Sequence, residues 1–472
     1  MPETIYDVAI IGSGPAGYTA AIRAGQYGLK TALIEKDSLL GGTCLHVGCI
    51  PTKALLFNAE LWDHLKEAKE YGIEGVDARK LNWAAVQDRR GKIVAKHAKG
   101  LEFLMKKNKV ETIKGFGSLT GPAKNGVFTV DVKGADGKTS QIKAKNILLS
   151  TGSEARMIPG LQADDKILTN IEILQLAEIP KSLVIVGAGA VGVEFASIYK
   201  SFGSEVTILE MLPRLVPVED EEVSKELARA FRKRGITAHT SAKVDKVEKT
   251  KSGVSVTFTV DGKQQKIDAE KILIAIGRKP RTENIGLEKT SIKPDRGFIK
   301  VDPWMQTSEP GIYAIGDIVL GTPQLAHVGS MEGMVAISKI AGKPGKPINP
   351  NHIPGATYSH PEIGSVGLTE AKAREEGYNV KVGKFPFTAN SRASIVGQHD
   401  GFIKIISDAK HGEILGVHII GPQATELIAE AVTAMELEAT VEDLMWTIHA
   451  HPTLAEAMLD ATSSVYGMAI NM

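Results

Sequence analysis

The sequence predicts an α/β fold in which two domains built around parallel sheets precede an α+β domain at the C-terminus. Three observations carry this prediction. A pattern of strand, glycine-rich turn, helix and strand occurs twice, over residues 6–35 and 182–210. The chain has 472 residues, whereas a single hydrophobic core stops growing near about 250–300 residues. A stretch with four prolines and three glycines at 341–355 is typical of a linker.

Both repeats have the same internal spacing. The first begins with an apolar strand at Val8–Ile11, and in each copy a G-x-G-x-x-G turn and a helix lead to a second apolar strand and a glutamate. The first glycine precedes that glutamate by 23 residues in both copies. The residues concerned are Gly12, Gly14, Gly17 and Glu35 in the first copy, and Gly187, Gly189, Gly192 and Glu210 in the second.

This pattern is that of a Rossmann-like dinucleotide-binding unit. The first glycine permits a tight turn, the second lets a pyrophosphate approach the backbone, and the third lets the helix pack on the strand. The helix start offers unpaired N–H groups to phosphates, and the glutamate accepts hydrogen bonds from ribose hydroxyls. Two matching copies predict two bound dinucleotides. Glu210 favours NAD, since a carboxylate repels the 2′-phosphate of NADP, and Arg214 lies beyond the strand end.

Cys44 and Cys49 are the only cysteines of the chain. A disulfide closing so short a loop removes only about 2 kcal/mol of unfolded-state entropy, a weak reason to cross-link a chain with an ample core. Such a strained ring is easily reduced, as catalytic disulfides are. The pair therefore predicts a redox-active dithiol. Two reduced cysteines packed in a core are the alternative, and a metal site is disfavoured because no second ligand pair follows.

The composition excludes several functional classes. Lys and Arg number 56 and Asp and Glu 55, and the resulting net charge of +1 gives no support for nucleic-acid binding. No apolar run approaches the roughly 20 residues that span a bilayer, and the N-terminus lacks the features of a secretory signal. Since two cysteines suit a reducing compartment, we expect a cytoplasmic protein; a matrix protein that has lost its transit peptide is the alternative.

Further segments mark the domain edges. Apolar strands followed by glycine run over 146–152 and 272–277. Beyond the linker, a strand at 402–406 and a helix at 425–438 predict an α+β domain without a phosphate-binding turn. We therefore divide the chain into domains 1–150, 151–280, 281–348 and 349–472.

The motifs and their order resemble those of the pyridine nucleotide–disulfide oxidoreductase family, and within it the members that oxidise dihydrolipoamide. The resemblance covers essentially the whole chain. It rests on both glycine turns, the second one followed by Val-Glu-Phe at 193–195, and on three further motifs. These are Gly-Gly-Thr-Cys-x4-Cys-Ile-Pro-Thr-Lys at 41–53, Gly-Ile-Tyr-Ala-Ile-Gly-Asp at 311–317 and His-Ala-His-Pro-Thr-Leu-Ala-Glu at 449–456.

The resemblance implies a cofactor for each domain. Domain 1–150 would bind FAD, with 281–348 completing the site; 151–280 would bind NAD; and 349–472 would form a homodimer. Asp317 would bind the ribityl-phosphate arm of the flavin, and His327 would lie near the isoalloxazine edge. Lys53 and Glu194 would interact beside the flavin. Further cofactor-binding positions would be Gly117, Thr151, Gly152, Gly277 and Ala326.

The family also implies a catalytic role for each cysteine. Cys44 would exchange with the substrate, and Cys49 would lie against the flavin. A helix start near Pro51, with a cation nearby, would lower the pKa of a thiolate there. His451 would be the base, oriented by Glu456 and supplied by the partner subunit, whereas we expect a structural role for His449.

The implied reaction reoxidises protein-bound dihydrolipoamide to lipoamide through the Cys44–Cys49 disulfide and FAD, with hydride transfer to NAD. The implied partners are lipoyl domains of 2-oxo-acid dehydrogenase complexes or of the glycine cleavage system. One departure is His46, where the family more commonly has Asn; a tolerated neighbour of the thiols is favoured over an imidazole that perturbs them.

Four rival readings have less support. A glutathione-type NADPH-dependent disulfide reductase conflicts with Glu210. Mercuric reductases and large thioredoxin reductases carry C-terminal cysteines, which residues 457–472 lack. A non-catalytic flavoprotein scaffold would not need both cysteines and the distant His451–Glu456 pair.

Overall fold

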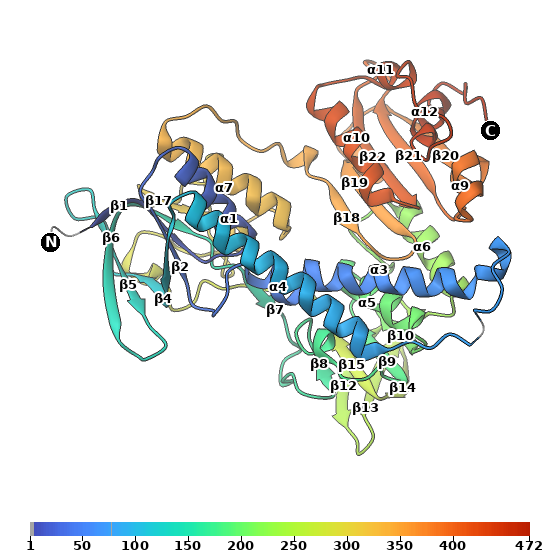
Figure 1. The fold of residues 1–472 in the computed structure, drawn as a ribbon. Helices are drawn as coiled ribbons and strands as arrows, with labels where there is room; N and C mark the ends of the chain where they lie inside the picture. Colours follow the sequence, from blue (N-terminus) through green and yellow to red (C-terminus); the bar gives the residue numbers. More distant parts are fainter. Residues whose placement is uncertain (1–3, 77) are drawn as a thin grey trace. The chain divides into compact units, whose positions relative to one another are not determined.

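The structure, a computed structural model, describes residues 4–76 and 78–472 (Figure 1). The chain forms two compact units, each assembled from three segments, which we call unit 1 and unit 2. Unit 1 comprises Met1–Ala54, Ala84–Arg156 and Arg278–Ile348, and unit 2 comprises Leu55–Trp83, Met157–Gly277 and Asn349–Met472.

Unit 1 is built on a seven-stranded sheet in the order β3-β2-β1-β6-β5-β4, with β17 also paired to β6. The parallel strands are β1 (Ile5–Ile11), β2 (Thr31–Glu35), β3 (Glu111–Lys114), β6 (Thr139–Leu149) and β17 (Ile312–Ala314). The antiparallel pairs involve β4 (Phe116–Leu119) and β5 (Phe128–Lys133). Alternate side chains of β1 enter two different hydrophobic cores. Ala9 and Ile11 pack into one core, and Val8 and Ile10 pack into the other. This explains the unbroken apolar run of the strand, since both its faces are buried.

The helices of unit 1 pack closely because small residues face one another. α1 (Pro15–Gln26) starts with proline at its first position, where a missing N–H costs nothing. It packs against α7 (Ala326–Ala341), where a Cβ on Gly333 would lie 2.8 Å from the Ala16 carbonyl oxygen. The other elements of this unit are α2 (Gly42–Val47), the start of α3 (Cys49–Lys66), most of α4 (Trp83–Lys107), η3 (Leu287–Lys289), η4 (Gly316–Ile318) and the β7 (Ser153–Ala155)–β16 (Arg278–Pro280) ribbon.

Unit 2 contains a five-stranded parallel sheet in the order β11-β10-β9-β15-β8. Its strands are β8 (Ile167–Leu168), β9 (Ser182–Val186), β10 (Glu205–Leu209), β11 (Thr237–His239) and β15 (Lys271–Ile274). α5 (Ala190–Ser201) and α6 (Glu221–Lys233) connect them, and β12 (Lys243–Lys249), β13 (Val254–Val260) and β14 (Lys263–Ala269) form an antiparallel sheet. The 3-10 turns η1 (Ala68–Tyr71) and η2 (Ile173–Gln175) also belong to unit 2.

The C-terminal part of unit 2 is an antiparallel sheet in the order β18-β19-β22-β21-β20, with helices around it. The strands are β18 (Gly355–Thr357), β19 (Glu362–Gly367), β20 (Val380–Pro386), β21 (Phe402–Asp408) and β22 (Ile414–Gly421). The helices and 3-10 turns are η5 (Pro350–His352), α8 (Glu370–Glu375), η6 (Phe387–Ala389), α9 (Ser391–Val396), α10 (Ala424–Glu436), α11 (Val441–Met445) and α12 (Glu456–Ser464). β22 is buried along its whole length.

The predicted fold class is confirmed by this mixture of two parallel sheets and a C-terminal α+β part. The first strand begins three residues earlier than expected, at Ile5, and the helix expected at 425–438 is α10. α3 begins at Cys49, slightly before the expected start near Pro51. The linker at 341–355 includes a short 3-10 turn, Pro350–His352. The four-domain division stays a prediction.

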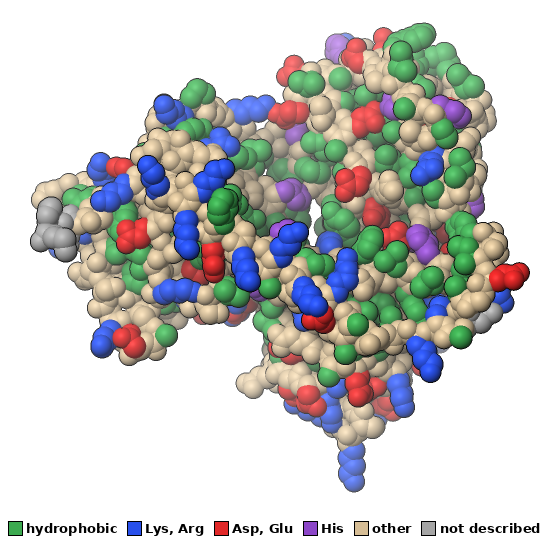
Figure 2. Space-filling model, viewed as in Figure 1, with side chains coloured by type: hydrophobic (Ala, Val, Ile, Leu, Met, Phe, Trp, Pro, Cys, Tyr) green, Lys and Arg blue, Asp and Glu red, His purple; other side chains and the backbone are tan. Residues whose placement is uncertain are grey.

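None of the helices in the described ranges is long and apolar enough to cross a bilayer. On the visible face of each unit, acidic and basic side chains are interspersed with apolar ones (Figure 2). This mixture agrees with the net charge of +1.

Candidate active site

The first glycine turn joins β1 to α1 through very close backbone packing. Gly12 has a φ of +104°, which favours glycine, and a Cβ there would lie 2.3 Å from the Ser150 carbonyl oxygen. A Cβ on Gly17 would lie 1.9 Å from the Gly12 oxygen, so α1 packs on the turn only because this side chain is missing. At Gly14 the described residues leave the Cβ position open to 4 Å. A ligand therefore has access to the backbone at Gly14.

Glu35, at the end of β2, is held against this turn. Its Oε2 accepts hydrogen bonds from the N–H (2.8 Å) and the hydroxyl (2.6 Å) of Ser13, and its Oε1 accepts one from the N–H of Asp37 (2.9 Å). The side chain is buried, with 7% exposed. The turn thus has a fixed acceptor at its side and unpaired N–H groups at the helix start.

The second glycine turn, between β9 and α5, repeats this packing. Gly187 has a φ of +102°, and a Cβ there would lie 2.4 Å from the Ala275 carbonyl oxygen. A Cβ on Gly192 would lie 2.0 Å from the Gly187 oxygen, whereas the Cβ position of Gly189 is open to 4 Å among the described residues. The close contact and the open position fall on the same glycines as in the first turn.

Glu210 occupies the place in unit 2 that Glu35 occupies in unit 1. Its Oε2 accepts a hydrogen bond from the N–H of Ala188 (2.6 Å) and its Oε1 one from the N–H of Leu212 (2.8 Å). The side chain of Arg214 donates instead to the carbonyl of Pro217 (2.9 Å). Glu210 is therefore a fixed acceptor beside the turn, and within the described part of the chain it forms no ion pair with Arg214.

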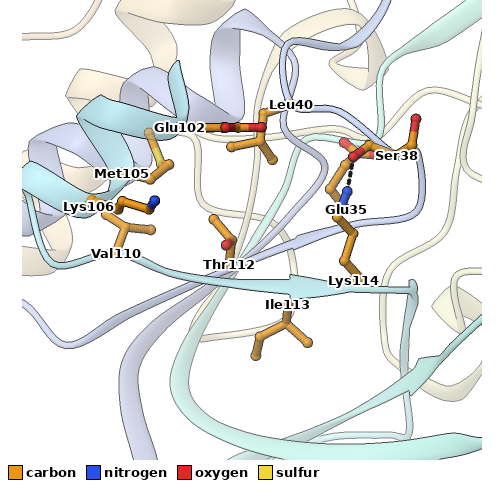
Figure 3. Close-up of a pocket in the computed structure, with 10 residues that line it drawn as sticks. All are labelled: Glu35, Ser38, Leu40, Glu102, Met105, Lys106, Val110, Thr112, Ile113 and Lys114. Atoms are coloured by element: carbon orange, nitrogen blue, oxygen red, sulfur yellow. Dashed lines mark hydrogen bonds between the residues drawn. The ribbon is translucent and has the colours of Figure 1, made fainter. Parts of the chain in front are cut away.

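A pocket lies beside Glu35 in unit 1, between β2, β3 and α4 (Figure 3). Leu40, Met105 and Val110 give it apolar walls, and Lys114 lies at its edge, where its Nζ donates to the carbonyl of Ser38. Apolar walls with a few placed polar groups are typical of a ligand pocket. The pocket thus combines apolar walls with an acceptor, Glu35, at one side.

The two cysteines lie at the junction of two helices. Cys44 is in α2 and Cys49 is the first residue of α3; both are half-buried thiols, joined by a hydrogen bond between their side chains. This hydrogen bond, burial and the charge of Cys49 raise the pKa of the Cys44 thiol, while Lys53 acts in the opposite direction. For Cys44 the neighbouring sulfur and burial outweigh the effect of Lys53. The lowering that we expected at the helix start near Pro51 concerns the thiolate of Cys49, the first residue of α3, and stays a prediction. Among the described residues no cluster of three His, Cys, Asp or Glu could hold a metal ion.

The dithiol segment packs directly on the first glycine turn. The N–H of Gly41 donates to the Ser13 carbonyl (3.0 Å), and a Cβ on Gly42 would lie 2.8 Å from the Cα of Gly14. Burial, with a contribution from the cysteine charges, raises the pKa of Tyr18 on α1. The structure thus places the two cysteines and the first glycine turn together in unit 1.

Asp317, in η4 of the same unit, is held by a small hydrogen-bond network. Its Oδ2 accepts a hydrogen bond from the Ser153 hydroxyl, and the Nε of Arg278 lies 3.8 Å from that oxygen. Arg278 also donates from Nε to the Ser153 hydroxyl (2.6 Å) and from Nη2 to the Ser153 carbonyl (2.8 Å). The β7–β16 ribbon therefore fixes this carboxylate from one side.

Glu332 fixes the neighbouring backbone from α7. Its Oε2 accepts a hydrogen bond from the N–H of Gly316 (2.5 Å), while its Oε1 is buried without a hydrogen-bond partner in the described part of the chain. Burial raises the pKa of Glu332 to about 7, with a smaller contribution from Asp317.

His451 and Glu456 form the predicted pair in unit 2. The Nδ1 of His451 lies 2.9 Å from Glu456 Oε1, and the other carboxylate oxygen accepts the N–H of Thr453 (2.7 Å). Burial opposes these hydrogen bonds, but together they lower the pKa of Glu456. The ring of His451 is 70% exposed.

His449 is 6% exposed and lies between Glu430 Oε1 (2.8 Å) and the Thr447 carbonyl (2.9 Å), which suits the structural role we expected.

The other predicted residues are distributed over several helices, strands and loops. Lys53 is in the second turn of α3, and Glu194, in α5, is 4% exposed and accepts the N–H of Tyr358 at its Oε1 (3.0 Å). Lys53 and Glu194 belong to different units, so their interaction stays a prediction. Gly117 lies in β4, Thr151 and Gly152 lie between β6 and β7, Gly277 immediately precedes β16, and Ala326 and His327 begin α7.

Sequence reasoning missed three residues that support this site. Ser13 binds Glu35, and Ser153 and Arg278 hold Asp317. Ser13 lies inside the glycine motif at an unspecified position, and Arg278 directly follows Gly277, which the motif did mark. For Ser153 the sequence carries no signal, because its partner is 164 residues away.

Comparison with known proteins agrees with this arrangement. Residues 6–333 match the family described as pyridine nucleotide-disulphide oxidoreductase, and residues 353–462 match the dimerisation domain of that family. The chain is 46% identical to a dihydrolipoyl dehydrogenase of Bacillus subtilis (strain 168) and 44% identical to one of Rhizobium etli. Both alignments cover 99% of this chain and 99% of the relative.

Solved structures share the fold over almost the whole chain. LpdA from Mycobacterium tuberculosis is 29% identical, with a TM-score of 0.89 over 96% of this chain and 98% of that one. A Cu(II) complex of the HOCl-induced flavoprotein disulfide reductase RclA from Escherichia coli is 26% identical, with a TM-score of 0.86 over 98% and 99%. The predicted family is confirmed: this chain belongs to the pyridine nucleotide-disulphide oxidoreductases, and its C-terminal part is their dimerisation domain.

Proposed function

We propose that this chain acts as a dihydrolipoyl dehydrogenase, a homodimeric flavoprotein that reoxidises dihydrolipoamide to lipoamide with NAD as the electron acceptor. The observation that carries the proposal is the packing of Gly41 and Gly42, just before Cys44, on the first glycine turn. A dithiol beside a dinucleotide-binding turn has a cofactor to pass electrons to, which a merely structural pair does not need. Full-length relatives with 44% and 46% identity carry this activity in their names.

The residues of unit 1 fit FAD. The open backbone at Gly14 accepts the pyrophosphate, Glu35 accepts ribose hydroxyls, and the pocket beside it accepts the adenine. Asp317, which Ser153 and Arg278 hold in place, would bind the ribityl-phosphate arm of the flavin. When bound, the flavin takes up the two electrons of the dithiol and passes them to NAD as hydride.

The residues of unit 2 fit NAD. Gly189 leaves room for the pyrophosphate, and the fixed carboxylate of Glu210 accepts ribose hydroxyls and repels a 2′-phosphate. The side chain of Arg214 donates to the carbonyl of Pro217 in its own loop. The site therefore favours NAD over NADP, which disfavours a glutathione-type NADPH-dependent reductase.

The chemistry of the chain itself begins with thiol exchange. A substrate thiolate attacks the Cys44 sulfur of the oxidised pair, the Cys44–Cys49 bond breaks and Cys49 leaves as a thiolate. The second substrate thiol then attacks the mixed disulfide, closes the lipoyl ring and releases Cys44. Two thiols of the substrate are oxidised and one disulfide of the chain is reduced, so atoms and electrons balance.

His451 takes the protons that this exchange releases. A thiolate rather than a thiol is the nucleophile, so a base with a pKa near neutrality is needed. Glu456 holds the Nδ1 side of the ring and stabilises the imidazolium, which leaves Nε2 to face a substrate. In the family this histidine belongs to the partner subunit, and we propose the same arrangement here.

The partner and the compartment follow from the substrate. The dihydrolipoyl group would be carried by a lipoyl domain of a 2-oxo-acid dehydrogenase complex or of the glycine cleavage system. A catalytic dithiol as the only cysteine pair suits a reducing compartment, so we place the protein in the cytoplasm.

Steady-state kinetics tests this function. The purified yellow dimer should reduce NAD with dihydrolipoamide, and should show no activity with glutathione disulfide and NADPH. Activity only with glutathione disulfide and NADPH would overturn the substrate and the nucleotide assignments. The matched control is Cys44→Ser, which retains the fold and both nucleotide sites but has no exchangeable thiol.

A further inference from the structure

A buried lysine connects the C-terminal sheet to α6, and both lie in unit 2. Lys404 in β21 has 2% of its side chain exposed. Its Nζ lies 3.0 Å from Asp220 Oδ1, 3.1 Å from Glu222 Oε2 and 2.7 Å from Glu370 Oε2. The N–H of Glu370 also donates to Asp220 Oδ2 (3.2 Å). We call these four residues the Lys404 cluster.

The cluster is located at the start of α6. Asp220 is the N-cap residue of this helix, and its Oδ1 accepts the N–H of Glu222 (3.0 Å). Burial works against both charges, yet their interactions raise the pKa of Lys404 and lower that of Asp220. All members therefore stay charged, and a buried ion pair with several partners holds its geometry well.

The segment just before α6 contacts the second glycine turn. The N–H of Val216 donates to the carbonyl of Ala188 (2.9 Å), the residue between Gly187 and Gly189. The carbonyl of Val216 in turn accepts the N–H of Glu219 (2.9 Å). Glu219 is buried, and its side chain is hydrogen-bonded to Ser365 of β19.

Val216 itself is strained. Its φ is +40°, which a β-branched residue rarely adopts. Such a conformation persists only where the surroundings hold the chain on both sides, and it is typical of functional sites. On one side, the N–H of Val216 is hydrogen-bonded to the Ala188 carbonyl. On the other side, Glu219 and Asp220 are bound to Ser365 and Lys404 of the C-terminal sheet.

We propose that Lys404 is a positioning residue for NAD. By fixing the start of α6, it keeps Val216 in its strained conformation. The hydrogen bond from the Val216 N–H to the Ala188 carbonyl then holds the backbone next to Gly189 in place. The dimerisation domain thereby takes part in nucleotide binding without touching the nucleotide. This inference rests on the proposed function, since it takes the second glycine turn as the NAD site.

The test measures NADH binding to the FAD-containing dimer by calorimetry. For Lys404→Met we expect the Kd of NADH to rise by between about threefold and thirtyfold, the range produced by substitutions in coupled networks. FAD content and the KM for dihydrolipoamide should stay unchanged. Lys381→Met is the matched control, because Lys381 is exposed on the neighbouring strand β20 and lies over the Tyr466 ring. A destabilised Lys404→Met dimer with wild-type NADH affinity would overturn the proposal, since it would show a purely structural role.

Two further variants keep the test decisive. If Lys404→Met does not fold, Ser365→Ala is measured in its place. This variant removes the hydrogen bond between Ser365 and Glu219 and should raise the Kd of NADH by about threefold. An unchanged Kd would overturn the proposal. Gly189→Val fills the open position of the turn and should abolish NADH binding. Normal binding by Gly189→Val would contradict the NAD site itself. Lost binding there, with normal binding in the Lys404 and Ser365 variants, would contradict only the positioning role.

Discussion

Gly192→Ala should lower the stability of the protein, whereas Gly189→Ala should weaken NADH binding and leave stability nearly unchanged, although the two residues lie in one turn. A Cβ on Gly192 would lie 2.0 Å from the Gly187 carbonyl oxygen, and an ordinary contact needs about 3.4 Å or more. The start of α5 must therefore move by about 1.4 Å. That shift strains the 2.6 Å hydrogen bond from Ala188 to Glu210.

The cost of Gly192→Ala follows from these contacts. Overpacking typically costs about 1–3 kcal/mol, and a weakened hydrogen bond to a charged group about 1.5–3 kcal/mol. Alanine in a helix returns about 1 kcal/mol relative to glycine. We expect the free energy of unfolding to fall by about 1.5–5 kcal/mol in total.

Gly189→Ala should leave stability nearly unchanged, within about 1 kcal/mol, because the Cβ meets open space and the φ of −71° is ordinary. It should nevertheless weaken NADH binding, since the methyl group occupies the place that the pyrophosphate approaches. Thermal unfolding and calorimetry on both variants measure the two effects. Wild-type stability in Gly192→Ala, or wild-type NADH affinity in Gly189→Ala, would refute this reasoning.

The remaining predictions concern the thiols, the base, the first turn and a buried carboxyl. Cys44→Ser should abolish dihydrolipoamide oxidation but leave NADH oxidation by a quinone intact; loss of both would contradict the assigned role. Glu456→Gln should lower kcat with dihydrolipoamide by about 10- to 100-fold and spare the quinone reaction, so an unchanged kcat would argue against the pair. Gly17→Ala should purify with less FAD than wild type, because its Cβ would lie 1.9 Å from the Gly12 oxygen; full flavin absorbance would contradict this. The pKa of Glu332 is raised to about 7 from its ordinary 4.5, so the native state gains stability from the proton below pH 4.5 and loses it as the pH rises to 7. Glu332→Gln should therefore gain in Tm relative to wild type between pH 5 and pH 8, and a constant difference would contradict the shift.

Much of the fold was predictable because its signals are local. The two glycine motifs place a turn between a buried strand and a helix, and the same three positions show the same packing in both turns. The register of the β7–β16 ribbon was not predictable. It pairs Ser153 with Pro280 and Ala155 with Arg278, and nothing in either short segment specifies a partner more than a hundred residues away.

The residues of the candidate site also fall into two groups, those that short motifs mark and those that only tertiary packing brings together. Cys44, Cys49, His451 and Glu456 stand in short motifs, and the His451–Glu456 pair needs only five residues of chain to form. The supports of Asp317 come from β7 and β16, and those of Asp220 from β21 and α8. Such partners depend on tertiary packing, so sequence reasoning had no means to find them. The raised pKa of Cys44 could not be predicted from the sequence either, because it depends on the contact between the Cys44 and Cys49 sulfurs.

The central claim is that Cys44 and Cys49 form the redox centre, and the cysteine content of the chain makes this directly measurable. Because there are two cysteines in the whole sequence, a thiol titration of the denatured protein reads the state of that pair alone. We predict no titratable thiol in the oxidised enzyme and two per chain after anaerobic reduction with NADH. Two thiols in the oxidised enzyme, or none after reduction, would contradict it.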